Sequence, residues 1–367
     1  MIRLGFDGHV LTGKRQGTRT WTERLLSAQA TSRRGTNVIV FSEDPSAVSA
    51  RFPTIESRLI RSRSSALRLL LEFPLLLRRA KLDVAVFHYL LPPLSLTKGV
   101  VVVHDVLPLS HPQLFPRRLR LRFALTTAWT LRQAQLILTV SEASADAIRR
   151  RYPFATGKLK VLPVGPSFEE EVYFAPAPAK PARQYVLAVG RVEPRKNMDL
   201  LVRAFAAAGL PDVDLKIVGQ VDMGYAWAGP DDQRIQVLSG IDDETLAHLY
   251  RGASLFVYPS SAEGFGIPLL DATLFGIPVI SSNLTSMPEV GGSLPTYFDP
   301  TRVAAMEELA DLIQGHFAGR PIYSPTVAER KRQLERFSWE SIARRFWALV
   351  DTIHSPGIDG KSSEPPR

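Results

Sequence analysis

The chain has 367 residues, of which 45% are hydrophobic and 22% are charged, and it contains no cysteine. This composition is typical of a folded globular protein of about two domains, which excludes a disordered, collagen-like or disulfide-stapled chain. The lack of cysteine also excludes a thiol nucleophile, an iron–sulfur cluster and a cysteine-ligated zinc site.

The net charge of +9 is unevenly distributed along the chain. Residues 1–180 carry a charge of +14, whereas residues 181–367 carry −5. A basic half of this kind fits a surface that meets an anionic partner, such as phospholipid headgroups, a lipid-linked pyrophosphate or nucleic acid, and it equally fits a solvated basic face.

The first ten residues, MIRLGFDGHV, carry Arg3 and Asp7 where a secretory signal needs an apolar stretch. They predict a first strand and no export signal. The most apolar window, residues 66–77, is far shorter than the roughly 20 apolar residues of a spanning helix. A cytoplasmic protein that does not cross a bilayer is therefore expected.

Short β-branched runs alternate with helical stretches in the first half, which is typical of parallel strands joined by crossover helices. Strands are predicted at residues 3–6, 37–42, 83–88, 99–105, 135–140 and 158–164. Helices are predicted at residues 18–30, 66–79, 119–134 and 142–152. Residues 1–168 are thus expected to form a doubly wound α/β domain.

A Pro-rich stretch, residues 169–183, interrupts this alternation and predicts a semi-rigid linker. A second α/β domain is predicted over residues 184–336, with a closing helix at 337–354 and a disordered tail at 355–367. Its strands are expected at residues 184–190, 214–219, 234–239, 254–259, 277–282 and 296–299.

Ligands of open α/β sheets bind at the carboxyl ends of the strands, so the loops that follow strands are the candidate sites. The loop GRVEPRKN, residues 190–197, places Arg191 and Lys196 just before a helix. Two cations at a helix N-terminus suit a diphosphate and can stabilise the charge that grows on it as it leaves. The alternative is a solvated loop with unpaired cations.

The loop SSAEGFGIPLLDA, residues 260–272, also follows a predicted strand. Gly264 and Gly266 allow the backbone to approach a ligand closely. The carboxylates of Glu263 and Asp271 can accept hydrogen bonds from sugar or ribose hydroxyls, although acidic residues near a helix start often only complement its dipole.

Two loops of the first half are weaker candidates. His104 and Asp105 stand at a strand end, where the histidine can form hydrogen bonds or shuttle a proton. The loop after the first strand resembles an anion-binding turn, but it matches neither a Walker A nor a GxGxxG motif. It combines glycines with cations before a helix: Gly13, Gly17, Lys14, Arg15 and Arg19.

Over nearly its whole length the chain resembles the retaining glycosyltransferases of family 4, bacterial mannosyltransferases among them. The most specific segments are GRVEPRKNMDLLVRAF and EGFGIPLLDATLFGIPVISSNLTSMPEV, with YRGASLFVYPS leading into the second. Weaker matches are TGKRQGTRTWTERLL, HDVLPLSHP and ILTVSEASADAI. The resemblance implies the GT-B fold, in which two Rossmann-like doubly wound α/β domains face each other across a deep cleft. The first domain would bind the acceptor, the second the nucleotide sugar, and the last helix would return to the first domain.

The resemblance also implies roles for individual residues. The catalytic set is His104, Arg191, Lys196 and Glu263; the donor set is Gly17, Gly190, Arg191, Lys196, Glu263, Gly264, Phe265, Gly266 and Asp271; and the acceptor set is Lys14, Arg15 and Asp105. Arg191 and Lys196 would bind the diphosphate and Glu263 the donor sugar. Asp271 stands where the family has a ribose-binding glutamate, and its shorter side chain requires a closer helix or weakens that contact.

The implied reaction moves a sugar from a nucleoside diphosphate sugar, GDP-mannose or a UDP-hexose, to a hydroxyl of a glycan or lipid-linked glycan, in the assembly of a cell-surface polysaccharide. Arg191 and Lys196 would replace a metal, so no metal and no cofactor besides the donor is expected. The DxD at residues 212–214 precedes a predicted strand and indicates a surface turn. No second carboxylate can be identified as a nucleophile, which favours front-face retention.

Two other classes of function remain open from the sequence. One is an inactive basic protein that docks on nucleic acid or a membrane, although no arrayed aromatic and basic motif supports a nucleic-acid partner. The other is a sugar-nucleotide epimerase, which would also use a two-domain cleft and would need no acceptor.

Residues 61–81 surround a leucine-rich centre with cations. Leucines at positions 67, 70, 71 and 75 fall near one helical face, and Pro74 is expected to bend or end this helix. The leucine face can lie on the anionic inner face of the cytoplasmic membrane, or it can pack on the first sheet.

Overall fold

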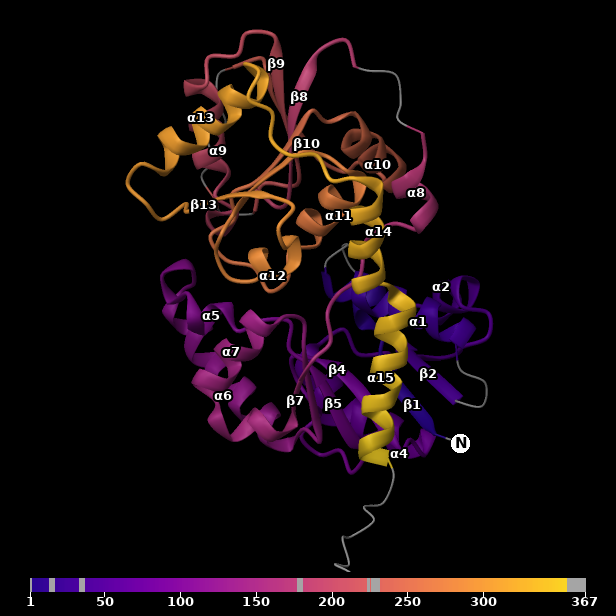
Figure 1. Ribbon diagram of the computed structural model, residues 1–367. Coiled ribbons are helices and arrows are strands. Elements are labelled where there is room, and N and C mark those ends of the chain that lie inside the picture. Colours follow the sequence, from indigo (N-terminus) through magenta and orange to yellow (C-terminus); the bar gives the residue numbers. More distant parts are fainter. Residues whose placement is uncertain are drawn as a thin grey trace, which may run out of the picture.

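The computed structural model describes residues 2–12, 17–32, 37–176, 181–222, 225 and 232–354. Within these ranges the chain forms two α/β domains, one above the other in Figure 1. The long helix α15 (Trp339–His354) leads from the second domain down along the first.

The first domain is built on a seven-stranded parallel sheet with the order β3-β2-β1-β4-β5-β6-β7. Its strands are β1 (Arg3–Asp7), β2 (Asn37–Ser42), β3 (Glu56–Leu59), β4 (Val84–His88), β5 (Lys98–Val102), β6 (Leu136–Thr139) and β7 (Leu159–Val161). The central strands are buried on both faces because helices cover both sides of the sheet, which explains their continuous apolar runs. Six of these strands were predicted, whereas the polar edge strand β3 was not.

The helices of the first domain are α1 (Gly17–Ser32), α2 (Pro45–Arg51), α3 (Ser65–Leu67), η2 (Arg68–Glu72), α4 (Phe73–Ala80), α5 (Leu107–Ser110), α6 (Arg117–Gln133) and α7 (Glu142–Arg151). Pro74 was expected to bend or end its helix, and it does not end it, since α4 continues to Ala80. The preceding residues form a π-helical turn in which the Phe73 N–H donates to the Arg68 carbonyl. This wider turn accommodates the proline, which has no N–H of its own.

The leucine-rich segment leaves the four leucines of its predicted face exposed and does not pack them on the first sheet. Phe73 and Leu77 pack into the core, whereas the side chains of Leu67, Leu70, Leu71 and Leu75 are 46–58% exposed. Among the described residues, no helix combines the length and the apolar character that crossing a membrane requires.

The second domain is built on a six-stranded parallel sheet with the order β10-β9-β8-β11-β12-β13. Its strands are β8 (Gln184–Val189), β9 (Val213–Val218), β10 (Ile235–Leu238), β11 (Leu255–Tyr258), β12 (Val279–Ser282) and β13 (Thr296–Phe298). Its helices are α9 (Met198–Ala207), α10 (Asp243–Gly252), α11 (Ile267–Phe275), α12 (Met287–Gly291), α13 (Ala305–Phe317) and α14 (Val327–Arg336). All six strands agree with the alternation read from the sequence.

The predicted linker begins with a short helix, α8 (Glu170–Phe174). Tyr173 on this helix is buried, and its ring centroid lies 4.7 Å from that of Phe275. The acidic part of the linker is therefore anchored on the second domain, whereas residues 177–180 lie outside the described residues.

Helix α15 packs on α1 of the first domain, which is the course that the resemblance implied. The ring of Phe346 lies 6.0 Å from Phe6 and 6.2 Å from Trp21, between centroids. At the start of this helix, Trp339 Nε1 donates to the Pro166 carbonyl over 2.9 Å. The predicted tail, residues 355–367, lies outside the described residues.

Candidate active site between the domains

A cavity of about 400 Å³ lies between the two domains, at loops that follow β5, β8 and β11. We call it the central cavity. Nine residues that the sequence singled out line it: Gly17, His104, Asp105, Arg191, Lys196, Glu263, Gly264, Phe265 and Gly266. The cavity therefore brings together loops that are far apart in the sequence, because the carboxyl ends of parallel strands share one edge of each sheet.

Two helix N-termini meet at the central cavity. Gly17 and Thr18 begin α1, and Ile267 and Pro268 begin α11, and all four line the cavity. A Cβ atom on Gly17 would lie 3.8 Å from Ile267 Cδ1. The exposed N–H groups and the positive dipole ends of both helices favour an anion between them.

An ionic cluster around the buried Glu263 and Lys196 forms the second-domain wall of this cavity. Lys196 Nζ lies 2.6 Å from Glu263 Oε1, and Arg195 Nη1 lies 2.7 Å from Glu263 Oε2. Arg195 also donates to Glu193, over 2.5 Å, and Lys196 donates to the Tyr258 hydroxyl over 3.0 Å. Both oxygens of Glu263 are thus held by cations in a fixed orientation.

Burial and the cluster together shift the pKa of Glu263 and of Lys196. Burial alone would raise the pKa of Glu263, but Arg195 and Lys196 outweigh it and hold this pKa at about 2. Burial lowers the pKa of Lys196, and Glu263 opposes that shift. Glu263 is therefore an ionised hydrogen-bond acceptor throughout the neutral range.

Local backbone geometry directs Lys196 inwards. Residues Pro194–Lys196 form the 3₁₀ turn η5, and Asn197 follows in the left-handed conformation, with φ of 57°. Asparagine tolerates this conformation better than most residues do. The turn leaves Lys196 only 7% exposed, with its side chain against Gly190.

The two predicted cations of this loop occupy different positions. Lys196 is buried, whereas the Arg191 side chain is 42% exposed and lies 3.3 Å from Asp222. Sequence reasoning missed Arg195, which holds Glu263. The only available signal was its place between the two chosen cations in the loop.

Gly264 joins the domains at the edge of the central cavity. A Cβ atom there would lie 2.9 Å from the His104 carbonyl oxygen. The Ser141 hydroxyl of the first domain donates to the Gly264 carbonyl over 2.6 Å, and Ser144 donates to it over 3.2 Å. This close backbone approach requires a residue without a side chain.

His104 belongs to a buried chain of hydrogen bonds that sequence reasoning did not foresee. His104 Nε2 lies 3.1 Å from His88 Nδ1, and His88 Nε2 lies 2.8 Å from the Thr22 hydroxyl. Thr22 donates its single proton to the Thr18 carbonyl, so His88 must donate to Thr22. Neutral His88 then accepts at Nδ1, and His104 donates from Nε2. The Nδ1 atom of His104 is left unprotonated, so this ring can only accept a further hydrogen bond.

Burial keeps both histidines neutral. It lowers the pKa of His104 to about 4, and burial together with His104 lowers the pKa of His88 well below its ordinary value. The imidazole rings therefore stay uncharged at neutral pH and act through hydrogen bonds.

These two histidines predict acid sensitivity of the fold. Between pH 6.5 and 4 the unfolded chain protonates His104 and the folded chain does not, so the free energy of unfolding falls as the pH falls. His104 alone should contribute a loss of about 3 kcal/mol over this range. Urea unfolding at pH 7 and pH 4.5 measures it, and a His88→Asn/His104→Asn double variant should show a flatter dependence. An equally steep dependence in that variant would assign the effect to other groups.

Asp271 does not line the central cavity, contrary to the position expected of a ribose ligand. Its side chain is buried, and its Oδ1 accepts hydrogen bonds from the Ser167 N–H over 3.0 Å and from the Tyr173 hydroxyl over 2.5 Å. The Asp271 side chain, which is shorter than a glutamate, is directed towards the segment that connects the two domains. In this arrangement it ties Ser167 and α8 to α11, and a contact with ribose stays a prediction.

Two further predicted features lie outside the lining of the central cavity. Gly190 packs on Lys196 behind the cavity wall. Asp214 begins to pair in β9 and contacts Arg183 at the amino end of the strands, which agrees with a structural turn at residues 212–214. Lys14 and Arg15 lie outside the described residues.

Two family models match the chain. One described as glycosyltransferase family 4 matches residues 17–169, and one described as glycosyl transferases group 1 matches residues 169–313. Among curated proteins, O-antigen chain mannosyltransferase B of Escherichia coli is 32% identical over 271 residues, which are 68% of this chain and 69% of that protein. The MMP alpha-(1->4)-mannosyltransferase of Mycolicibacterium hassiacum is 29% identical over 60% of this chain, which spans only 54% of that relative.

Solved structures share the architecture at low identity. Sucrose-phosphate synthase from Thermosynechococcus elongatus has a TM-score of 0.74 at 20% identity, covering 96% of this chain and 99% of its own. HepE from Anabaena, in complex with UDP and glucose, has a TM-score of 0.71 at 18% identity, covering 96% of this chain and 100% of its own. These likenesses confirm the GT-B fold.

Proposed function

Because the chain belongs to the family 4, group 1 glycosyltransferases, we propose that it transfers a hexose from a nucleoside diphosphate sugar to a hydroxyl of a glycan or lipid-linked glycan, with retention. The transferred sugar in this proposal is mannose, donated by GDP-mannose, since several curated relatives are named as mannosyltransferases. In this proposal the reaction is a step in the assembly of a cell-surface polysaccharide. UDP-hexoses are the alternative donors.

The central cavity is the observation that carries this proposal. Its two helix N-termini and Arg191 provide positive potential for a diphosphate. Glu263, held in place by Lys196 and Arg195, provides a fixed acceptor for the hydroxyls of the donor sugar. Charge that develops on the leaving diphosphate is then stabilised by groups that need no reorganisation.

Retention is proposed to follow a front-face route. Both oxygens of Glu263 are engaged by cations, and its pKa of about 2 makes the carboxylate a weak nucleophile. Asp105, whose pKa is raised by burial, lies on the first-domain side of the cavity and can orient the incoming hydroxyl.

Nucleotide-dependent thermal stabilisation and product analysis test the function. A donor at a hundred times its dissociation constant should stabilise the protein by about 2.7 kcal/mol, and we expect this from GDP-mannose in a screen with UDP- and ADP-sugars. Incubation with donor and acceptor should yield an α-linked product. Release of an epimerised sugar without acceptor would favour an epimerase, and no response to any nucleotide would favour an inactive docking protein.

Metal chelation is expected to leave transfer largely intact. The protein supplies Arg191 and the helix N-termini where other transferases use a cation, so EDTA should not change the turnover number substantially. Transfer rates with and without EDTA give the answer. Full loss of activity that Mn²⁺ or Mg²⁺ restores would contradict a metal-independent reaction.

The remaining part of the proposal is that the protein binds an anionic membrane, at the inner face of the cytoplasmic membrane. No nucleic-acid partner is proposed. Each exposed cation near an anionic surface contributes about 1 kcal/mol, and exposed cations and leucines share residues 61–81. We expect salt-sensitive sedimentation with anionic liposomes and little with neutral ones. A Leu71→Ser/Leu75→Ser variant should sediment less. Equal binding to both liposomes, or none at low salt, would favour a soluble acceptor.

A further inference from the structure

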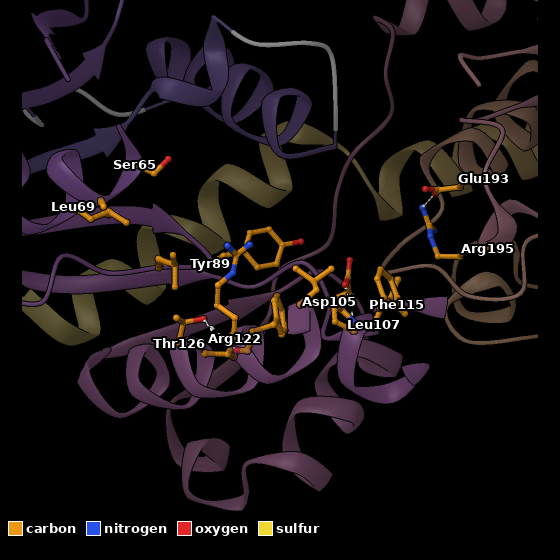
Figure 2. A pocket seen from close by; sticks show the side chains of 16 residues that line it. Ser65, Leu69, Tyr89, Asp105, Leu107, Phe115, Arg122, Thr126, Glu193 and Arg195 are labelled. Carbon is orange, nitrogen blue, oxygen red and sulfur yellow. Dashed lines mark hydrogen bonds and ion pairs between the residues drawn. The ribbon is translucent and has the colours of Figure 1, made fainter. Parts of the chain in front are cut away.

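A second cavity, of about 740 Å³, adjoins the central cavity on the side of the first domain (Figure 2). We call it the side cavity. It shares Tyr89, Asp105, Glu193 and Arg195 with the central cavity, so a molecule that fills it reaches the place where the donor sugar is proposed to bind. Its volume is within the range of sites that hold small organic ligands.

The walls of the side cavity are mainly apolar. They come from α3, η2, α5 and α6, and their carbon surface includes Leu69, Leu107, Phe115, Leu119 and Phe123. A free glycan would leave its hydroxyls without partners on such walls, and this costs binding free energy. The side cavity therefore suits an apolar group better than a sugar.

Exposed leucines occur on the same helices, outside the lining of the side cavity. Leu67 and Leu70 on α3 and η2, and Leu121 and Leu125 on α6, have side chains that are 46–65% exposed. An apolar chain that enters the cavity can remain in contact with these leucines outside it.

Within the described part of the chain, one cation of the wall has no carboxylate partner. Arg195 is engaged by Glu193 and Glu263, whereas among the described residues Arg122 forms no ion pair with a carboxylate. Figure 2 shows that the Arg122 side chain extends from α6 towards the ring of Tyr89. An anion bound next to the apolar group would pair with the positive charge of the Arg122 guanidinium.

Tyr89 stands at the junction of the two cavities. It adopts the left-handed backbone conformation, with φ of 61°, which is costly for a bulky side chain and is often found at functional sites. Burial and the nearby Asp105 raise the pKa of Tyr89 well above its ordinary value, so the hydroxyl keeps its proton. The side chain is placed to separate an apolar group on one side from a sugar on the other.

We propose that the side cavity binds the apolar group of an amphiphilic acceptor, with Arg122 on the phosphate that links this group to the acceptor's sugar. The placement of the reacting hydroxyl near Tyr89 and Asp105 rests on the proposed function. The binding of an apolar phosphate in the side cavity does not rest on it. The assignment names one substrate class, a phosphate-linked apolar chain that carries a glycan.

Calorimetric titration with decyl phosphate, below its critical micelle concentration, tests the assignment directly. Decyl phosphate should bind to the wild-type protein, and Ala66→Trp, at an exposed position of the cavity lining, should weaken it tenfold or more. Arg122→Gln should weaken decyl phosphate tenfold or more and leave the binding of uncharged decyl glucoside unchanged. Ala50→Trp on α2 and Arg118→Gln on α6, which lie at exposed positions outside the cavity lining, should match the wild type.

Decyl phosphate binding that is equal in the wild type, Ala66→Trp and Arg122→Gln would overturn the assignment, as would an absence of binding or an equal loss in the two control variants. Titrations with GDP and UDP keep the two proposals apart. If neither nucleotide binds while decyl phosphate behaves as expected, the proposed transferase function is wrong and the side cavity assignment stands. If a nucleotide binds and decyl phosphate does not, the side cavity assignment alone is wrong.

Discussion

Replacing either Glu263 or Lys196 with alanine is expected to lower the turnover number by a hundredfold or more while the protein still folds. Glu263 is held between Lys196 and Arg195 at distances of 2.6 and 2.7 Å, so either change disturbs the group proposed to bind the donor sugar. Loss of one preorganised transition-state contact typically costs a factor of 10² to 10³. Turnover at saturating donor and acceptor, with circular dichroism for the fold, measures the effect.

Loss of stability must be separated from loss of catalysis in these variants. Removing one member of a buried ion pair leaves the partner's charge uncompensated, which can cost about 3–5 kcal/mol. The double variant Glu263→Gln/Lys196→Met removes both charges and should be more stable than either alanine variant while remaining inactive. Arg183→Gln, which breaks an exposed contact with Asp214 at the far end of the sheet, serves as the matched control. Near-wild-type turnover in either alanine variant would refute the site.

A Gly264→Ala substitution is expected to lower turnover by about a hundredfold. The added Cβ would lie 2.9 Å from the His104 carbonyl oxygen and 3.2 Å from Asp105 Cβ, so the domains must move apart at the central cavity. A displacement of about 1 Å in the reacting groups can cost a factor of 10² in rate. Both the turnover number and the melting temperature should be measured, because the added methyl group is expected to lower the turnover number more than the melting temperature.

Gly157→Ala provides the control for this substitution. Gly157 has open space around it and does not adopt the left-handed conformation, so its Cβ should be tolerated. Turnover within a factor of about three of the wild type is expected there. If Gly264→Ala kept full activity, the domains would not need the close approach seen at this glycine.

Much of the fold could be predicted because buried parallel strands carry continuous apolar runs. The segments NVIVFS, VAVFH and LFVY stand out from their polar surroundings, and Val84–His88 is buried along its whole length. The edge strand β3, ESRL, was missed because one side of an edge strand has no neighbour and its residues can be polar. The π turn before Pro74 was missed because sequence periodicity does not show which hydrogen bonds a helix adopts.

Part of the site could be predicted as well. Gly17, His104, Lys196 and Glu263 each follow a strand, and in parallel sheets these positions lie at one edge. Arg195 and His88 could not be selected, since nothing in a loop or strand shows which side chain turns towards a partner 16 or 68 residues away. The position of Asp271 in the sequence predicted a contact with ribose. In the structure its buried carboxylate accepts a hydrogen bond from the Tyr173 hydroxyl, which no local pattern could show.

The sequence by itself determined the two α/β domains, the loops that carry the chemistry and the basic character of the first domain, because strand period, glycine placement and charge are local properties of the chain. Only the tertiary structure decided the protonation of His104, the cations that hold Glu263, the exposure of Leu71 and the apolar walls of the side cavity. Each of these depends on contacts between segments distant in sequence, and desolvation and side-chain packing exist only once those segments meet.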